Sequence, residues 1–279
     1  GIFVIQDSGG TPLLELNTDA ATNVFLGLDA GNVNDASGDG FNNTYIGTRA
    51  GQAIVDYSNN TAVGYQAMAF GTGGYYNTAL GVSAMSAVDG GGSNVALGVS
   101  ALSSNETGSF NTVIGREAGT GVGNSSNVSN NVLIGYQAGY GLLTGGDGNI
   151  LMGYMAGDNL TTGANNIVIG TDINAPAAAS ANTLTIGNLI FGTGLDGTAN
   201  TLSTGNIGIG DATPDAKLNI LSTTEQLRLD YDDSNYVSFT VGVSGDLTVG
   251  ATGGNILFAD ATALNVGGAT AQAYNFIAG

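Results

Sequence analysis

Polar, small and aliphatic positions alternate along residues 23–170 in a pattern that recurs at a short and regular interval, as from Asn60 to Asn77 and from Asn77 to Asn94. Each copy begins with a pentad: Asn, an apolar residue or Thr, any residue, an aliphatic residue, Gly. The nine pentads begin at Asn23, Asn43, Asn60, Asn77, Asn94, Asn111, Asn131, Asn149 and Asn166 and end at Gly27, Gly47, Gly64, Gly81, Gly98, Gly115, Gly135, Gly153 and Gly170. Such regular self-similarity predicts a repeat architecture.

The length of the repeat favours stacked β-coils. Helical repeats and propeller blades need roughly 33 to 50 residues per unit, about two to three times the interval between these pentads, and Gly at the end of every pentad costs a helix about 1 kcal/mol relative to Ala. We therefore expect a strand over the pentad, a tight turn, a second short strand over a small-residue patch such as 65–68, and a turn back. Stacking these coils gives a parallel β-solenoid, or β-roll, over residues 21–181.

Within the pentad, the fourth position is always aliphatic, so we expect it to face the interior of the coil. Successive side chains of a strand point to opposite faces, which predicts that the third position points outward. That position is apolar too, and a coil this thin cannot cover it alone. The sequence therefore predicts a homo-oligomer interface formed by Phe25, Tyr45, Ala62, Ala79, Ala96, Val113, Leu133, Leu151 and Val168.

The invariant letters of the pentad have structural explanations. Asn at the entrance of each strand tolerates turn geometry and can stack as a hydrogen-bonded ladder. Gly ends the strand where positive φ or close backbone approach is needed. We predict that these residues build the coil and bind no ligand.

The flanking segments are also β-rich. Residues 1–20 read as a β-hairpin that caps the roll, with turn letters DSGG at 7–10. The stretch 174–181 breaks the periodicity, and NTLTIG from Asn182 reads as a capping rung. Short strand candidates separated by Gly and Asp continue to the end of the chain. We assign 182–279 to a second β-rich shaft region.

The amino-acid composition excludes several classes of function. The 279 residues include 48 Gly, no Cys and no His, with 4 Lys+Arg against 22 Asp+Glu and a net charge of −18. Cys–His and Ser–His nucleophile pairs, imidazole or thiolate metal sites and disulfides are excluded. The negative charge opposes nucleic-acid and anionic-lipid binding, and no segment reads as a membrane span. We expect no cofactor and no enzyme activity, and the initial Gly suggests a mature or truncated chain.

Acidic residues offer weak candidates for other chemistry. Asp35 and Asp39 lie in a segment that looks like half of a calcium loop, but no Glu follows at EF-hand spacing. Asp230, Asp232 and Asp233 are explained as turn residues. Paired carboxylates leave open a polysaccharide-degrading tailspike, although the small side chains predict little room for a cleft.

Binding is the better prediction. Loops at 32–42, 120–130 and 144–148 lengthen the repeat, and insertions in solenoids often line a binding face. Tyr57, Tyr75, Tyr76 and Tyr140 are candidates to stack on sugars there or to act as packed aromatics.

Two segments of the chain resemble known protein families. The N-x-x-aliphatic-G repeats with their Ala/Gly patches resemble the heads of trimeric autotransporter adhesins, which implies a left-handed parallel β-roll in a homotrimer. GNIGIGDATPDAKLNI at 205–220 is similar to a segment of bacteriophage tail fibres, with Asp211 in place of the usual Thr. The resemblances imply an extracellular structural and adhesive fibre on a virion or cell, bound to a glycan or protein receptor. A bacterial surface adhesin or filament subunit is the alternative within this class.

Overall fold

The computed structural model describes residues 3–6, 8–10, 12–17, 22–32, 40–55, 57–121, 126–232 and 234–252. Over these ranges the chain is all-β, and it divides into two compact units, residues 1–221 and 222–279. The first unit contains a parallel β-solenoid with the spacing predicted from the pentads, and the second contains a separate antiparallel sheet.

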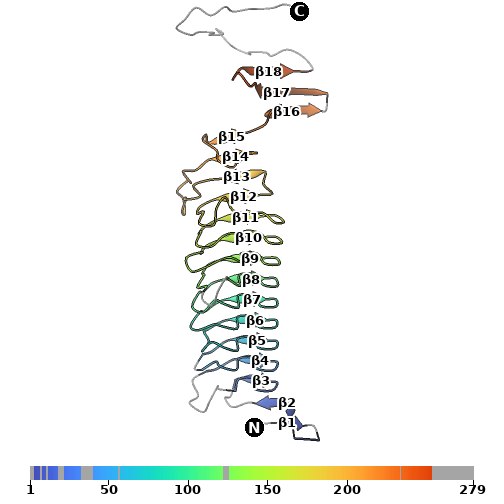
Figure 1. Ribbon diagram of the computed structural model, residues 1–279, viewed down its shortest axis with the longest axis vertical. Coiled ribbons are helices and arrows are strands. Elements are labelled where there is room, and N and C mark those ends of the chain that lie inside the picture. Colours follow the sequence, from blue (N-terminus) through green and yellow to red (C-terminus); the bar gives the residue numbers. More distant parts are fainter. Residues whose placement is uncertain are drawn as a thin grey trace, which may run out of the picture. The chain divides into compact units, whose positions relative to one another are not determined.

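The first unit is built on one sheet whose fifteen strands follow each other in chain order (Figure 1). Strands β1 (Phe3–Gln6) and β2 (Pro12–Asn17) form the predicted N-terminal hairpin, and β2 pairs antiparallel with β3. The parallel strands are β3 Val24–Leu26, β4 Thr44–Ile46, β5 Thr61–Val63, β6 Thr78–Leu80, β7 Val95–Leu97, β8 Thr112–Ile114, β9 Val132–Ile134, β10 Ile150–Met152 and β11 Ile167–Ile169. Each occupies the centre of a pentad, and equivalent pentad positions pair across the ladder.

The sheet continues past the last pentad. β12 (Leu184–Ile186) pairs parallel with β11, and β13 (Ile190–Gly192) then reverses direction. β14 (Ile207–Ile209) pairs antiparallel with β13 and parallel with β15 (Leu218–Ile220). Strand direction thus changes between Ile186 and Ile190, after the rung that begins at Asn182, and the compact unit ends only at Leu221.

The pentad glycine limits each strand to three residues. Gly98 has a φ of 141°, and a Cβ placed on it would lie 2.4 Å from the carbonyl oxygen of Gly115 in the next rung. A side chain there would collide with backbone, which cannot move without breaking the stack. Because the same contact recurs from rung to rung, glycine is required at this corner of the coil.

The small-residue patch forms a turn, which differs from the predicted second strand. Its residues alternate into the left-handed region, as at Gln66 (φ 58°) and Met68 (φ 52°). An extended strand cannot contain such residues. The turn still joins neighbouring rungs, because Met68 N–H donates to the Ala84 carbonyl at 3.0 Å.

The structure reverses the predicted orientation of the strands. All nine third-position side chains, predicted to form an oligomer interface, are buried inside the chain's own coil: Phe25, Tyr45, Ala62, Ala79, Ala96, Val113, Leu133, Leu151 and Val168. The second and fourth positions point outward, so the fourth position is not the interior one. Alternation was correctly predicted; the assignment of its two faces was wrong.

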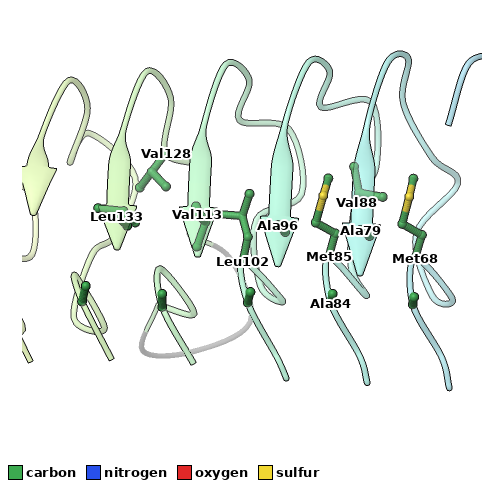
Figure 2. Close-up of a cluster of buried hydrophobic side chains, with 14 of the residues drawn as sticks. Met68, Ala79, Ala84, Met85, Val88, Ala96, Leu102, Val113, Val128 and Leu133 are labelled. Atoms are coloured by element: carbon green, nitrogen blue, oxygen red, sulfur yellow. The ribbon is translucent and has the colours of Figure 1, made fainter. Parts of the chain in front are cut away.

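The residue six positions after each third-position residue explains this orientation. In every rung but the last, the third-position side chain shares the interior with a left-handed residue of the turn, and the two sizes compensate. The pairs are Phe25 with Gly31, Tyr45 with Gly51, Ala62 with Met68, Ala79 with Met85, Ala96 with Leu102, Val113 with Gly119, Leu133 with Gly139 and Leu151 with Gly157. A Cβ on Gly51 would lie 2.5 Å from the Tyr45 ring. Figure 2 shows Met68, Met85 and Leu102 filling the space between the strands and the turns.

The second unit contains one antiparallel sheet of β16 (Leu227–Asp232), β17 (Asn235–Val241) and β18 (Leu247–Ala251). Arg228 lies over the ring of Tyr236, 3.7 Å from its centroid. Among the residues of 222–252 whose exposure is described, none is buried. The described part of this sheet therefore has no hydrophobic core of its own.

Candidate functional site

The nine repeat asparagines form a ladder along the solenoid. The backbone N–H of each asparagine after Asn23 donates to the side-chain Oδ1 of the asparagine one rung before it, as from Asn94 to Asn77 at 2.9 Å and from Asn111 to Asn94 at 3.0 Å. Thr183 continues the series by donating to Asn166 with both its N–H and its hydroxyl. Buried polar groups are thereby satisfied from one rung to the next.

The other end of the amide holds the coil closed. Asn94 Nδ2 donates to the Gly108 carbonyl at 2.9 Å, across the interior of its own rung. Equivalent bonds run from Asn60 to Gly74 and from Asn77 to Gly91. Both ends of these amides therefore have a structural role in the coil.

The outer face of the parallel sheet, defined here as the second- and fourth-position side chains of the nine pentads, is uncharged. None of these side chains is buried, and Leu80 is 45% exposed. The second positions are Val24, Thr44, Thr61, Thr78, Val95, Thr112, Val132, Ile150 and Ile167; the fourth are Leu26, Ile46, Val63, Leu80, Leu97, Ile114, Ile134, Met152 and Ile169. In-register pairing aligns each set into a continuous column.

The residue after each pentad glycine extends this face as a further column. Tyr136 and Tyr154 stack there, with ring centroids 5.3 Å apart, and Arg116 lies 5.9 Å from the Tyr136 ring. Arg116 is itself paired with Glu117, which raises the arginine's pKa through the hydrogen bond between them. All residues of this column are described, and its only formal charge is therefore balanced locally.

The predicted metal candidates Asp35 and Asp39 lie outside the described residues. Within the described ranges, no group of three or more acidic side chains is placed to hold a metal ion. Asp232 accepts hydrogen bonds from Ser234 N–H and from Asn235, and these bonds lower its pKa, with the Asn235 amide contributing most. Asp232 is the last residue of β16, and its carboxylate holds the turn that follows. Asp230 lies within β16, paired with Tyr236, so its assignment to a turn was wrong, and Asp233 is not among the described residues.

Residues 205–220 form a strand–loop–strand unit that contains β14 and β15. Asn206 Nδ2 donates to the Pro214 carbonyl at 2.9 Å, and Lys217 Nζ donates to the Gly205 carbonyl at 3.0 Å. Asp211 accepts from Thr213 N–H and from the Asn219 amide, which lowers its pKa, the Thr213 bond being the larger cause. Its polar residues are used to hold the loop in shape.

The four predicted tyrosines fall into two groups. Tyr57 is partly buried against the core, and Tyr140 is partly exposed. Tyr75 and Tyr76 are exposed, and Tyr75 contacts the ring of Tyr57 at a centroid distance of 4.9 Å.

Of the predicted loops, 144–148 is described in full, whereas parts of 32–42 and 120–130 lie outside the described residues.

The sequence-based prediction missed one exposed aromatic residue, Phe110. Like Tyr76, it directly precedes a ladder asparagine and adopts the left-handed conformation, with φ of 63° and 62° respectively. Asn and Ser occupy this position in other rungs, as at Asn59 and Ser93. Two aromatics in a column that otherwise favours Asn, Ser and Gly were a signal readable in the sequence.

Comparison with protein-family models, with curated proteins and with solved structures finds no match for this chain. Over the described ranges, no helical segment has the length and apolarity required to cross a bilayer.

Proposed function

We propose that the protein is a structural and adhesive fibre subunit that packs against copies of itself, as a homotrimer, and presents an attachment surface without performing catalysis. The observation that carries this proposal is the uncharged, largely aliphatic outer face of the solenoid sheet. It takes over the role that the third pentad positions had in the sequence-based prediction.

Parallel sheets are normally covered on both faces. Here one face packs on the coil interior, while the other exposes columns of aliphatic and Thr side chains along β3–β11. Nine rungs extend about 40 Å, and three strand residues about 10 Å, so the face measures roughly 400 Å² in projection. Apolar patches of this size commonly mark interaction sites.

A second copy of the same chain is the occupant that fits this face. Its columns repeat at the spacing of the rungs, so two faces placed side by side match at every rung. Neither column carries a charge, although the chain has a net charge of −18. The charge of the chain therefore lies elsewhere and does not oppose close contact at this face.

The second unit supports the same proposal. The hydrophobic side chains Leu229, Val241 and Leu247 of its sheet are all more than half exposed. A three-stranded sheet needs a packed hydrophobic face to be stable. Equivalent sheets from neighbouring copies supply such a face. The choice of three copies follows the resemblance to trimeric adhesin heads and tail fibres, as do the extracellular location and the attachment role.

Native mass spectrometry and sedimentation of the full chain test this proposal. We expect a trimer, with Leu97→Glu shifting the population toward monomer because a charge is placed in the middle of the outer face. Val55→Glu is the matched control: Val55 is a comparably exposed aliphatic residue outside the outer-face columns. A wild-type monomer of 27.6 kDa, or equal effects of the two variants, would refute the proposal.

A further inference from the structure

The corner of the coil that precedes the sheet carries an exposed row of aromatic side chains, defined here as the aromatic edge: Tyr75, Tyr76 and Phe110. Tyr76 and Phe110 are 66% and 65% exposed, and Tyr75 is also exposed. They lie just before the ladder asparagines Asn77 and Asn111, so this row is separate from the outer face assigned above to a neighbouring copy.

The spacing of the row is fixed by the backbone. Phe110 N–H donates to the Gly92 carbonyl at 3.1 Å, and Ser93 N–H donates to the Tyr75 carbonyl at 2.9 Å. Tyr76, Ser93 and Phe110 therefore occupy the same position in three successive rungs. At about 4.8 Å per rung, the backbone positions of the two aromatics are about 10 Å apart.

The rung between the two aromatics has almost no side chain at this corner. Gly92 and Ser93 occupy it, and Ser93 is exposed. A flat ring in contact with two aromatic faces requires about 7–8 Å between them. The spacing of the backbone positions of Tyr76 and Phe110 is therefore sufficient for one planar group, and the exposed Ser93 in the rung between them offers a hydroxyl as a hydrogen-bond donor and acceptor.

Neither aromatic is explained by folding. Both adopt the left-handed conformation, which bulky L-residues rarely occupy, and both leave most of their apolar surface in water. Asn at this position, as in the rung of Asn59, satisfies the backbone better. Two exposed aromatic side chains held in left-handed conformation at the same position of the coil point to a ligand that contacts ring faces.

The surrounding charge limits the class of ligand. Asp89 and Glu106 are the only charged residues between 57 and 110, and no Lys or Arg lies between Arg49 and Arg116. An anionic ligand would find no cation here and would be repelled by the net charge of −18. Aromatic faces beside hydroxyl and amide groups suit a neutral molecule with an apolar ring face and a polar rim.

We infer that the aromatic edge binds a neutral saccharide, with one sugar ring held between Tyr76 and Phe110 over Ser93. This inference rests on the proposed function, for which it supplies a class of receptor. Tyr75 extends the contact surface beside Tyr76, since their ring centroids are 6.4 Å apart.

The double variant Tyr76→Asn/Phe110→Asn tests the site without endangering the fold, because Asn is the residue that neighbouring rungs place in this conformation. Wild type and variant are titrated by calorimetry with neutral gluco-, galacto- and N-acetylglucosamine oligosaccharides at millimolar concentrations, and with polygalacturonate as an anionic probe. Phe70→Ser is the control, since Phe70 is 62% exposed but lies on another part of the coil.

We expect a neutral oligosaccharide to bind wild type and Phe70→Ser equally, and the double variant at least tenfold more weakly. Absence of neutral binding to wild type, a preference for the anionic probe, or unchanged affinity of the double variant would overturn the site. Native mass measured on the same samples separates the two proposals: a trimer that binds no saccharide refutes only the site, and a saccharide-binding monomer refutes only the fibre.

Discussion

Moving one leucine across the coil interior tests the size compensation that orients the strands. Ala96 and Leu102 are both fully buried, and in the next rung the same two positions hold Val113 and Gly119. The double variant Ala96→Leu/Leu102→Gly transfers the leucine side chain from the turn to the strand. It thereby recreates the arrangement already present at Leu133 and Gly139.

The two single changes damage the core in opposite ways. Ala96→Leu adds three carbons beside the buried Leu102, and overpacking of this kind costs about 1–3 kcal/mol. Leu102→Gly leaves a cavity that costs about 3–5 kcal/mol. Leu102 has a φ of 53°, so glycine relieves about 1 kcal/mol of strain there, while the added freedom of the unfolded chain takes away a similar amount.

The double variant restores the buried volume. Volume-conserving exchanges in cores usually cost below about 1.5 kcal/mol, whereas the two single changes sum to about 4–8 kcal/mol. We therefore expect the double variant to exceed the stability that additivity predicts by about 2 kcal/mol or more, which is within the range of measured couplings between contacting residues.

Guanidinium denaturation followed by far-UV circular dichroism measures this coupling. All four proteins are compared at one protein concentration, because stability in an oligomer depends on concentration. Additive losses, or an Ala96→Leu variant as stable as wild type, would show that residue 96 does not face residue 102. The assignment of the strand faces would then fail.

Two further substitutions probe the interior. Asn94→Ala leaves the buried Asn111 N–H without its partner and removes one of the two donors to the Gly108 carbonyl, which keeps its bond from Asn105, so denaturation should show a loss of about 2–4 kcal/mol; a loss below about 1 kcal/mol would contradict the ladder's role. No described group completes a hydrogen bond to the buried Tyr45 hydroxyl, and burial raises the pKa of Tyr45 despite a smaller opposing effect of the Asn60 amide. Because the neutral form is favoured in the folded state, wild type should lose stability as pH rises above about 10, the pKa of an unfolded-state tyrosine. Tyr45→Phe keeps the ring stacked on Phe25 and should be at least as stable as wild type at pH 7 and lose less stability at high pH; identical alkaline profiles by thermal melting would disprove this.

Much of the architecture was predictable because it depends on local rules that recur in every repeat. The short period, the glycine at the end of each strand and the asparagine at its start together specify a stacked parallel β-coil. The N-terminal hairpin followed from two β-rich runs flanking DSGG. These features depend on backbone geometry, which the residue types at fixed positions of the pentad specify directly.

The small-residue patch was harder to interpret. Its side chains suit a short strand, but residues such as Gln66 and Met68 adopt positive φ because the turn must return the chain within a few residues. Left-handed conformations of Gln and Met are uncommon. Only the closed coil, in which the Met68 side chain fills space beside Ala62, stabilises them.

The candidate surfaces depended on a choice that local pattern could not make. Alternation establishes that Val113 and Ile114 face opposite ways, but both are aliphatic, so polarity does not say which is inside. The sequence by itself determined the repeat, its strands and its asparagine ladder. The tertiary structure decided which face is the core, because the third-position side chain must fit beside the turn residue six positions later and the other buried side chains of its rung, and their volumes must together fill the interior.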